Sequence, residues 1–420
     1  MLNVNLNISP PWASGVAFDI MMALGGSDKT MIVGGAVRDW LSNVPVKDID
    51  FASKLLPEES MKILIKAGYN VKPIGIGHGT ITVYKNGKTY EITSLRKDVV
   101  TDGRHAKVIF GGSWEDDAYR RDFTVNALYS DEYGSVQDPT GQGFKDLENK
   151  IIRFIGNPQK RIKEDYIRIV RYFRFLSNYS HNIDKSAIDA CIKYSKNLNI
   201  ISGERIVSEL EKIFLVKNAV NIIDILVTKN VMHSIYNISL IDSFVLDKKF
   251  LKKLLGVFHL NSNRKYYAFI LYTSFIIALQ KNKKTDVRQI IASIINRFHL
   301  SNNNKTLFKR NIDWIENKES ITKPLIIKLW LDHGELFVSD LKDILMIIDN
   351  KKVKILSNSF NNPPPVFSIS GKDLKKSGIG EGKEMGKALD LIRDWWIDQD
   401  CLPNKNECLK FYKKIISRRP

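Results

Sequence analysis

The segment that decides the fold is Met31-Ile-Val-Gly-Gly-Ala-Val-Arg-Asp39, and Lys47-Asp-Ile-Asp50 follows it after a short connection. Apolar residues typical of a buried strand lead directly into two glycines, after which an apolar-periodic stretch begins. Because glycines carry no side chain, the backbone N–H groups of Gly34 and Gly35 can approach an anion, and the start of a helix adds positive charge. Arg38 would supply a guanidinium fork one turn later. The segment predicts a strand–turn–helix unit suited to a phosphate, although a Gly-Gly turn alone is more often structural.

Two carboxylates close behind this unit favour the functional interpretation. Alternate residues of a strand face the same side, so Asp48 and Asp50 are expected to point together, away from Ile49. Side-by-side carboxylates repel each other unless a cation lies between them, and Mg²⁺ prefers such oxygen ligands. Magnesium ions so placed can hold the attacking hydroxyl and the leaving pyrophosphate of a displacement at phosphorus. The pair therefore predicts a metal site formed by Asp48 and Asp50.

The next strands are expected to form a hairpin that carries Glu91. Runs rich in β-formers span residues 80–84 and 89–93, and Asn86-Gly87 between them is a strong signal for a two-residue turn. Glu91 would complete the metal site, as a further catalytic carboxylate, if it faces Asp50. A solvated carboxylate at a sheet edge fits the pattern equally well. The first 150 residues are thus predicted to form a mixed α/β domain.

Two arginines lie beside an Asp and an Asn in the stretch Arg120-Arg-Asp-Phe-Thr-Val-Asn-Ala-Leu128. The apolar flanks predict that this segment is at least half-buried. Arginine favours partners that accept two parallel hydrogen bonds, which are phosphates or carboxylates. Arg121 is therefore a candidate ligand of phosphate. An Arg–Asp network within the domain is the alternative, because it uses the same donors.

Beyond this domain the apolar spacing becomes that of helices, and one amphipathic helix is predicted over residues 161–175. Asp165, Arg168, Arg171 and Arg174 recur every three residues and would form a row on one face. Such a row is usually a solvated face. Here, however, an Asp can accept from an exocyclic amino group while an Arg donates to a ring nitrogen or carbonyl, which matches cytosine and adenine but not uracil or guanine. Asp165 and Arg168 are candidate readers of a base, and Arg171 and Arg174 would hold base or phosphates.

Composition narrows the class of partner. The chain has 420 residues with 64 Lys and Arg against 46 Asp and Glu, a net charge of +18 that indicates an anionic partner, nucleic acid or an acidic membrane surface. The three scattered cysteines fit neither a disulfide framework nor a thiolate zinc site. The longest apolar run, residues 266–279, is shorter than the about 20 residues that span a bilayer. Residues 1–12 lack a secretory pattern, so a cytoplasmic protein with no membrane attachment is expected.

Together these motifs resemble class II CCA-adding tRNA nucleotidyltransferases and the closely related bacterial poly(A) polymerases. The matching segments, in the family's order, are GGAVRD with KDID, TDGRHA over residues 101–106, RRDFTVNAL, EDYIRIVRYFRF and GERIVSEL over residues 203–210. From residue 215 onward the likeness is diffuse. Residues 370–392, SGKDLKKSGIGEGKEMGKALDLI, still resemble the tail of bacterial members.

The resemblance implies an α+β fold, with a polymerase-β-like nucleotidyltransferase head built on a mixed sheet and followed by an all-helical neck, body and tail. The expected boundaries are 1–146 for the catalytic head, 147–214 for the neck that recognises the base, 215–360 for the body and 361–420 for the tail that binds tRNA.

The resemblance also implies roles for residues. Asp48 and Asp50 would bind Mg²⁺. Gly35, Arg38 and Arg121 would contact the triphosphate and sugar of the incoming nucleotide. Asp165 and Arg168 would read the base with support from Arg171 and Arg174, and residues 101–106 would belong to a flexible loop that helps the switch from C to A.

The implied activity is template-independent addition of C, C and A to tRNA 3′ ends from CTP and ATP, with release of pyrophosphate. Polyadenylation is the nearest alternative, but bacterial poly(A) polymerases carry Gly-Arg-Arg-Phe where this chain has Pro73-Ile-Gly-Ile-Gly-His-Gly-Thr80. A non-catalytic RNA-binding protein is a further alternative, which the paired carboxylates disfavour. Whether full CCA, only CC or only A is added stays open at this point, as do protein partners and oligomeric state.

Overall fold

The computed structural model describes most of the first 237 residues and the helices nearest the C-terminus. The described residues are 9–101, 106–179, 182–216, 218–237, 252, 287–299, 302, 305–306, 321–348, 350–376, 379–380 and 382–416. They belong to two compact units, Met1–Val245 and Leu246–Pro420. Most of the expected flexible loop, residues 102–105, and the apolar run 266–279 lie outside the described residues.

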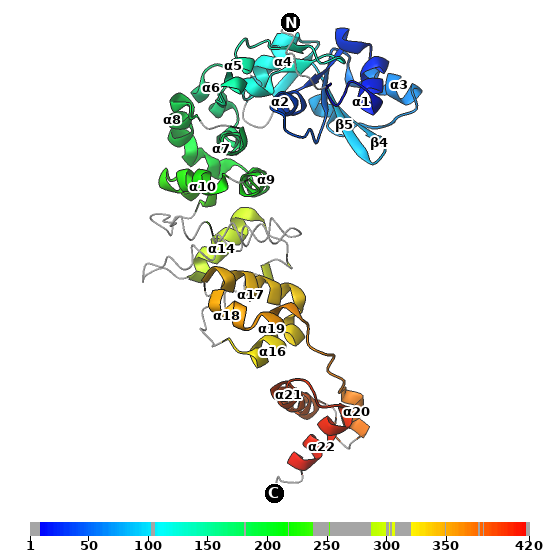
Figure 1. Cartoon of the computed structure of the whole chain (residues 1–420), viewed down its shortest axis with the longest axis vertical. Coiled ribbons are helices and arrows are strands. Elements are labelled where there is room, and N and C mark those ends of the chain that lie inside the picture. Colours follow the sequence, from blue (N-terminus) through cyan, green and yellow to red (C-terminus); the bar gives the residue numbers. More distant parts are fainter. Residues whose placement is uncertain are drawn as a thin grey trace. The chain divides into compact units, whose positions relative to one another are not determined.

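The first unit is built on a seven-stranded mixed sheet (Figure 1). Its strands lie in the order β3 (Asn70–Lys72), β4 (Thr80–Lys85), β5 (Lys88–Ser94), β2 (Asp50–Ser53), β1 (Thr30–Val33), β8 (Tyr129–Ser130) and β9 (Val136–Gln137). β2 and β5 pair in parallel, and the other neighbours in this sheet pair antiparallel. A separate ribbon pairs β6 (Arg96–Thr101) with β7 (Ala106–Phe110). The mixed sheet predicted from the sequence is confirmed.

The strand predictions hold with one correction. Asn86 and Gly87 join β4 to β5 with φ angles of 53° and 71°, which is the left-handed backbone of a type I′ hairpin turn. The strand behind the glycine turn begins only at Asp50, where its ladder with β1 starts at the pair Val33–Asp50. Asp48 lies in the preceding loop, so the prediction that both carboxylates alternate along one strand was wrong for Asp48.

The two faces of the sheet are buried by different helices. One face packs against α1 (Gly15–Ala23), α2 (Gly35–Leu41) and α3 (Pro57–Lys66), and Phe51 of β2 is fully buried there. The next residue of β2, Ala52, is buried on the opposite face under α4 (Trp114–Arg120). Because side chains alternate along a strand, Asp50 shares the face of Ala52. Asp50 is therefore on the side of the sheet that α4 covers.

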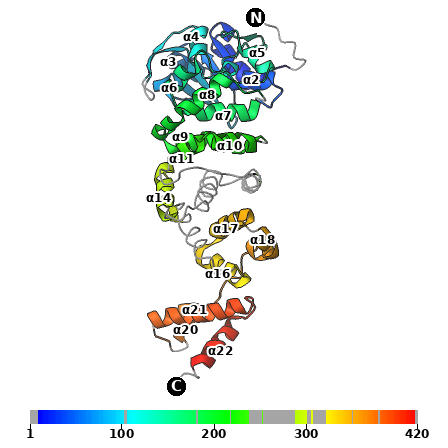
Figure 2. The same cartoon turned by 90° about the vertical axis from the view of Figure 1, so that its left-hand side faces the viewer.

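Helices make up the rest of the first unit. They are α5 (Gly143–Glu148), α6 (Pro158–Glu164), α7 (Ile167–Tyr179), α8 (Lys185–Tyr194), α9 (Gly203–Phe214), α10 (Ala219–Thr228) and α11 (Val231–Tyr236). α7 packs against α9 (Figure 2). Both helices are strongly amphipathic, and their buried sides include Val170 and Phe173 of α7 and Ile206 and Leu210 of α9.

The single helix predicted over residues 161–175 is in fact two helices. α6 ends at Glu164 and α7 begins at Ile167, and Asp165 between them has an extended backbone with φ −156° and ψ 110°. The Asp165 side chain accepts a hydrogen bond from the Ile167 N–H at 3.3 Å. An Asp that bonds to nearby backbone in this way competes with continuation of a helix. The break places Asp165 at the start of α7 instead of in a row along it.

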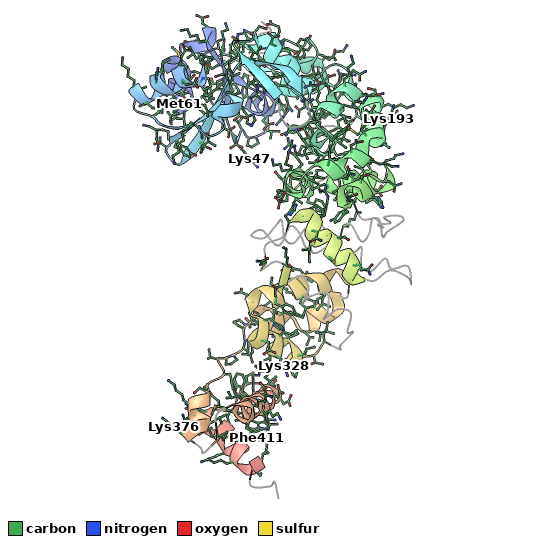
Figure 3. All side chains as sticks on the ribbon, turned by 180° about the vertical axis from the view of Figure 1, so that it is seen from behind. Lys47, Met61, Lys193, Lys328, Lys376 and Phe411 are labelled. Carbon is green, nitrogen blue, oxygen red and sulfur yellow. The ribbon has the colours of Figure 1, made fainter. Side chains whose placement is uncertain are left out.

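The described part of the second unit contains helices and no strand. The helices are α14 (Val287–Phe298), α16 (Lys323–His333), α17 (Glu335–Ile348), α18 (Asn350–Ile355), α19 (Ser357–Asn361), α20 (Gly371–Lys376), α21 (Lys383–Asp398) and α22 (Lys405–Ile416). The ring of Phe411 in α22, labelled in Figure 3, stacks on Trp395 of α21 with centroids 4.1 Å apart. α19 ends at Asn361, and three consecutive prolines begin two residues later, at Pro363.

The α+β class is confirmed by the mixed sheet and the helices that follow it. The finer division at residues 146, 214 and 360 stays a prediction. A search of the described helices finds none with the length and apolar character needed to cross a membrane.

Candidate active site

A cleft of about 570 Å³ in the first unit gathers nine of the eleven predicted site residues. Six arginines and four carboxylates line it, so positive charge prevails in a small space. The predicted residues in its wall are Gly34, Gly35, Arg38, Asp50, Arg121, Asp165, Arg168, Arg171 and Arg174. The volume lies in the range typical of small-molecule sites.

The glycine turn forms one wall of the cleft. Gly34 has φ 74° and ψ −121°, a backbone that residues with a side chain rarely adopt, and α2 begins at Gly35. A Cβ added at Gly34 would lie 3.3 Å from Nη1 of Arg121. The missing side chain therefore lets the Arg121 guanidinium approach the turn.

Arg38 is held rigidly in the cleft. Its Nη2 donates to Asp39 Oδ1 at 2.8 Å and to Tyr179 Oη at 2.9 Å, and its Nη1 donates to Asn126. The guanidinium also lies over the Tyr179 ring, 4.1 Å from its centroid, and over Phe175 at 5.0 Å. Only 6% of the residue is exposed. Arg38 is thus a fixed cation in the wall of the cleft, and its contact with phosphate stays a prediction.

Arg121 depends on a buried carboxylate in α4. Its Nη2 donates to Asp117 Oδ2 at 2.8 Å, and the Tyr129 hydroxyl donates to the same oxygen at 2.6 Å. Burial alone would raise the pKa of Asp117, but Arg121 and Arg120 lower it to about 2. Asp117 is therefore ionised at neutral pH and keeps Arg121 charged. The Arg–Asp network, one of the two alternatives for Arg121, is therefore present. The other, a contact of Arg121 with phosphate, stays a prediction.

The carboxylates predicted to bind metal are only partly assembled. Asp50 and Glu91 are direct neighbours in the parallel pairing of β2 with β5, so they share a face, which settles the orientation of Glu91. Desolvation by the surrounding protein raises the pKa of Asp50 to about 6. The charges of Glu91 and Asp48 add to the rise, and Arg121 opposes it. Asp48 is exposed and lines a different depression beside Lys47. Asp50 alone of the three lines the cleft.

The candidate base readers lie together at the start of α7, each with a partner. Arg168 donates from Nη1 to Glu164 Oε2 at 2.6 Å, at the end of α6. Asp165 accepts at Oδ2 from Arg205 Nη2 of α9 at 2.6 Å. The exposed fractions of the Arg168 and Asp165 side chains are 16% and 26%. Both side chains are accessible from the cleft.

Arg171 and Arg174 share one buried acid. Glu209 of α9 contacts Arg171 at 3.3 Å and Arg174 at 2.9 Å, and Arg171 also pairs with Asp122 at 2.7 Å. Burial opposes ionisation of Asp122, but Arg171 and a hydrogen bond from Asn126 hold its pKa well below the usual value.

Four further charged or amide side chains in the cleft were not predicted as site residues: Asp122, Asn126, Arg205 and Glu209. These residues lie inside RRDFTVNAL and GERIVSEL, two motifs that the resemblance had already marked. Membership of these two motifs was therefore the sequence signal that could have identified the four residues. The pairing of Arg205 with Asp165, 40 residues apart, required the fold.

Two protein-family models match the first unit. The Poly A polymerase head domain matches residues 30–153, and the probable RNA and SrmB-binding site of polymerase A matches residues 182–237. Together they cover the sheet, the glycine turn and helices α8 to α11.

Named relatives extend the likeness along the chain. The human CCA tRNA nucleotidyltransferase 1, mitochondrial, is 33% identical over 398 residues, which cover 91% of this chain and 86% of that protein. A CCA-adding enzyme of Streptococcus gordonii is 42% identical over 185 residues, covering 44% of this chain and 45% of its own length.

Solved structures share the fold. The CCA-adding enzyme of Bacillus stearothermophilus in complex with CTP superposes with a TM-score of 0.71 at 24% identity, over 96% of both chains. The CCA-adding enzyme of Thermotoga maritima complexed with tRNA gives a TM-score of 0.64 at 19% identity, over 95% of both chains.

Proposed function

We propose that this chain, which belongs to the CCA-adding tRNA nucleotidyltransferases of the poly(A) polymerase family, adds C, C and A to the 3′ end of tRNA. CTP and ATP would be the nucleotide donors and pyrophosphate the product. The observation that carries this proposal is the arginine-rich cleft, in which Asp165 and Arg168 adjoin the glycine turn and Asp50. Phosphate ligands and a base-sized hydrogen-bonding pair therefore line one small space.

In the proposed reaction, the 3′-hydroxyl oxygen of tRNA bonds to the α-phosphorus of the nucleotide. The bond from that phosphorus to the bridging β-phosphate oxygen breaks, pyrophosphate leaves and the hydroxyl proton passes to solvent water. Arg38 and Arg121 would hold the triphosphate, since side-chain hydrogen bonds fix both guanidinium groups before the nucleotide arrives. Orientation and charge are the main contributions that a protein can make to phosphoryl transfer.

The residues around Asp50 fit a magnesium ion. Asp50 and Glu91 lie side by side on neighbouring strands, and crowding together with the Glu91 charge raises the pKa of Asp50, which a cation would reverse. Asp50 and Asp48 would hold the ion, with Glu91 available from β5. Among the described residues no three such side chains converge on one point, so water and phosphate oxygens would complete the coordination. When bound, Mg²⁺ would stabilise negative charge on the reacting phosphates.

Base selection would rest on Asp165 and Arg168. Asp165 would accept from the exocyclic amino group of cytosine or adenine, and Arg168 would donate to the ring acceptors beside it. Uracil and guanine place a carbonyl and a ring N–H in the opposite arrangement, which would leave both side chains unsatisfied. Arg171 and Arg174 would hold the base or phosphates deeper in the cleft.

The second unit would bind the tRNA backbone, because it carries most of the excess positive charge and its last 60 residues form the predicted tail. The cytoplasmic location expected from the sequence stays a prediction.

The test uses the full-length protein and a labelled tRNA that ends before CCA. We expect incorporation from CTP and then ATP, little from UTP or GTP, and loss of incorporation when EDTA removes divalent ions. A long A tract on a homopolymer primer would instead identify a poly(A) polymerase. Binding of tRNA without incorporation of either nucleotide would identify a non-catalytic RNA-binding protein.

A further inference from the structure

The motif GERIVSEL, residues 203–210, has no part in the reaction proposed above, although α9 forms a wall of the cleft. Arg205, Ser208 and Glu209 of this helix all line it. Two of them carry charges, and each is paired with a charged residue of the α7 region that faces the same space. α9 therefore supports the residues that would contact the nucleotide.

Arg205 contacts the candidate base reader directly. Its Nη2 donates to Asp165 Oδ2 at 2.6 Å, while the other carboxylate oxygen, Oδ1, accepts from the backbone N–H of Ile167 at 3.3 Å. The two contacts fix both oxygens and hence the plane of the carboxylate. Without Arg205 one oxygen would lose its partner, and the terminal torsion of an Asp side chain is intrinsically broad.

These contacts leave the carboxylate able to bind a base. Each carboxylate oxygen can accept about two hydrogen bonds, and the contacts with Arg205 and Ile167 use one on each. A free acceptor site thus remains on Asp165, at an orientation that the protein sets before the nucleotide enters.

We propose that Arg205 is a positioning residue for base selection, which holds the Asp165 carboxylate in the plane where it accepts the amino group of C or A. This inference rests on the proposed base-reading role of Asp165 and Arg168. Arg205 itself would not distinguish bases, since its hydrogen bond is directed to Asp165.

Glu209, on the same helix, provides a contrast. It contacts Arg171 and Arg174, which are not the proposed readers of the amino group. Changing Glu209 to Gln should therefore alter the affinity for all four nucleotides by similar factors. Changing Arg205 should alter the ratio between nucleotides.

The experiment measures kcat/KM of the full-length protein for each nucleotide on tRNA lacking CCA. Arg205→Ala should lower the CTP-over-UTP ratio by about tenfold, comparable to losing part of one base-reading contact. Arg205→Lys should restore part of the ratio, because an ammonium can still donate to Asp165. Lys212→Ala is the matched control, since it removes one exposed positive charge from the same helix outside the cleft. Its ratio should equal that of the unmodified protein.

The possible outcomes separate this inference from the proposed function. If Asp165→Ala lowers the ratio and Arg205→Ala does not, Arg205 has no positioning role. An equal fall for CTP and UTP in Arg205→Ala also overturns the inference, because it would indicate a phosphate contact or damage to the fold. If the unmodified protein shows no preference for CTP over UTP, the proposed function itself fails.

Discussion

The two units of the chain use charge differently. Met1–Val245 contains 31 Lys and Arg against 28 Asp and Glu, a net +3, whereas Leu246–Pro420 contains 33 against 18, a net +15. In the first unit three arginines of the cleft, Arg121, Arg171 and Arg174, pair with buried acids. The side chain of one of these acids, Asp117, is 1% exposed. In the second, the pair of Lys328 (labelled in Figure 3) with Asp394 leaves these side chains 42% and 50% exposed. Buried pairs fix geometry, while exposed excess charge supplies attraction to a polyanion without fixing position.

The largest expected effect separates the rate of nucleotide transfer from the affinity for tRNA. Asp50→Ala should lower the rate of nucleotide transfer by roughly a thousandfold or more, because it removes the cleft carboxylate that is proposed to hold Mg²⁺ at the reacting phosphates. The affinity for tRNA should change little, since the charge of the second unit is untouched. Initial rates of CMP incorporation and equilibrium tRNA binding measure the two quantities. A parallel loss of tRNA binding would contradict the division between the units.

The next effect tests the buried pairs of the first unit. Asp117→Asn should lower the free energy of unfolding by about 3 kcal/mol, because Arg121 and Arg120 would lose their buried counter-charge. Denaturant unfolding followed by a probe of the first unit measures this loss. A change below about 1 kcal/mol would show that the network relaxes without the charge.

The same residue predicts a pH dependence. The pKa of Asp117 in the folded protein is about 2, below its usual 3.8. Its ionised form therefore contributes stability that is fully present above pH 3.8 and is lost as the pH falls toward 2. The difference in stability between the unmodified protein and Asp117→Asn should shrink over this interval. A constant difference would point to shape instead of charge.

A smaller effect is expected on the choice between CTP and UTP. Arg168→Ala should reduce the CTP-over-UTP ratio of kcat/KM by roughly tenfold while tRNA affinity stays the same, because the proposed base-reading pair loses one member. Arg393→Ala, which removes an arginine paired with Asp332 in the second unit, is the comparison. It should leave the ratio unchanged. If Arg168→Ala reduces tRNA binding but keeps the ratio, the base-reading role is wrong.

Most strands and turns of the first unit could be predicted from the sequence, but the contacts that set the ends of its elements could not. The glycine turn, the hairpin at Asn86-Gly87 and the mixed sheet follow from local chemistry that a few residues determine. The break at Asp165 was missed because apolar periodicity continues across it, whereas the side chain of Asp165 bonds to the Ile167 N–H and its backbone is extended. The strand start at Asp50 was missed for a related reason, since pairing with β1 sets it.

The partners of the site residues were beyond the sequence for a physical reason. Arg121 has several acidic residues near it in the chain, and nothing local shows that Asp117, one helical turn back, is the one it pairs with. Glu209 meets Arg171 only because α9 packs on α7. Residue types and motifs therefore indicated the cleft, and tertiary packing decided which charges are fixed in it.

The smallest effect is expected for an Asp→Asn substitution in the second unit, which is compared with Asp117→Asn in the first. Asp394→Asn removes the partner of Lys328 at 3.0 Å, but both side chains are largely exposed. Water and salt screen such a pair, so the free energy of unfolding should change by no more than about 0.5 kcal/mol. Denaturant unfolding under the conditions used for Asp117→Asn gives a direct comparison. A loss as large as that of Asp117→Asn would mean that exposed pairs also hold the second unit together, and its charge could no longer be assigned mainly to attraction.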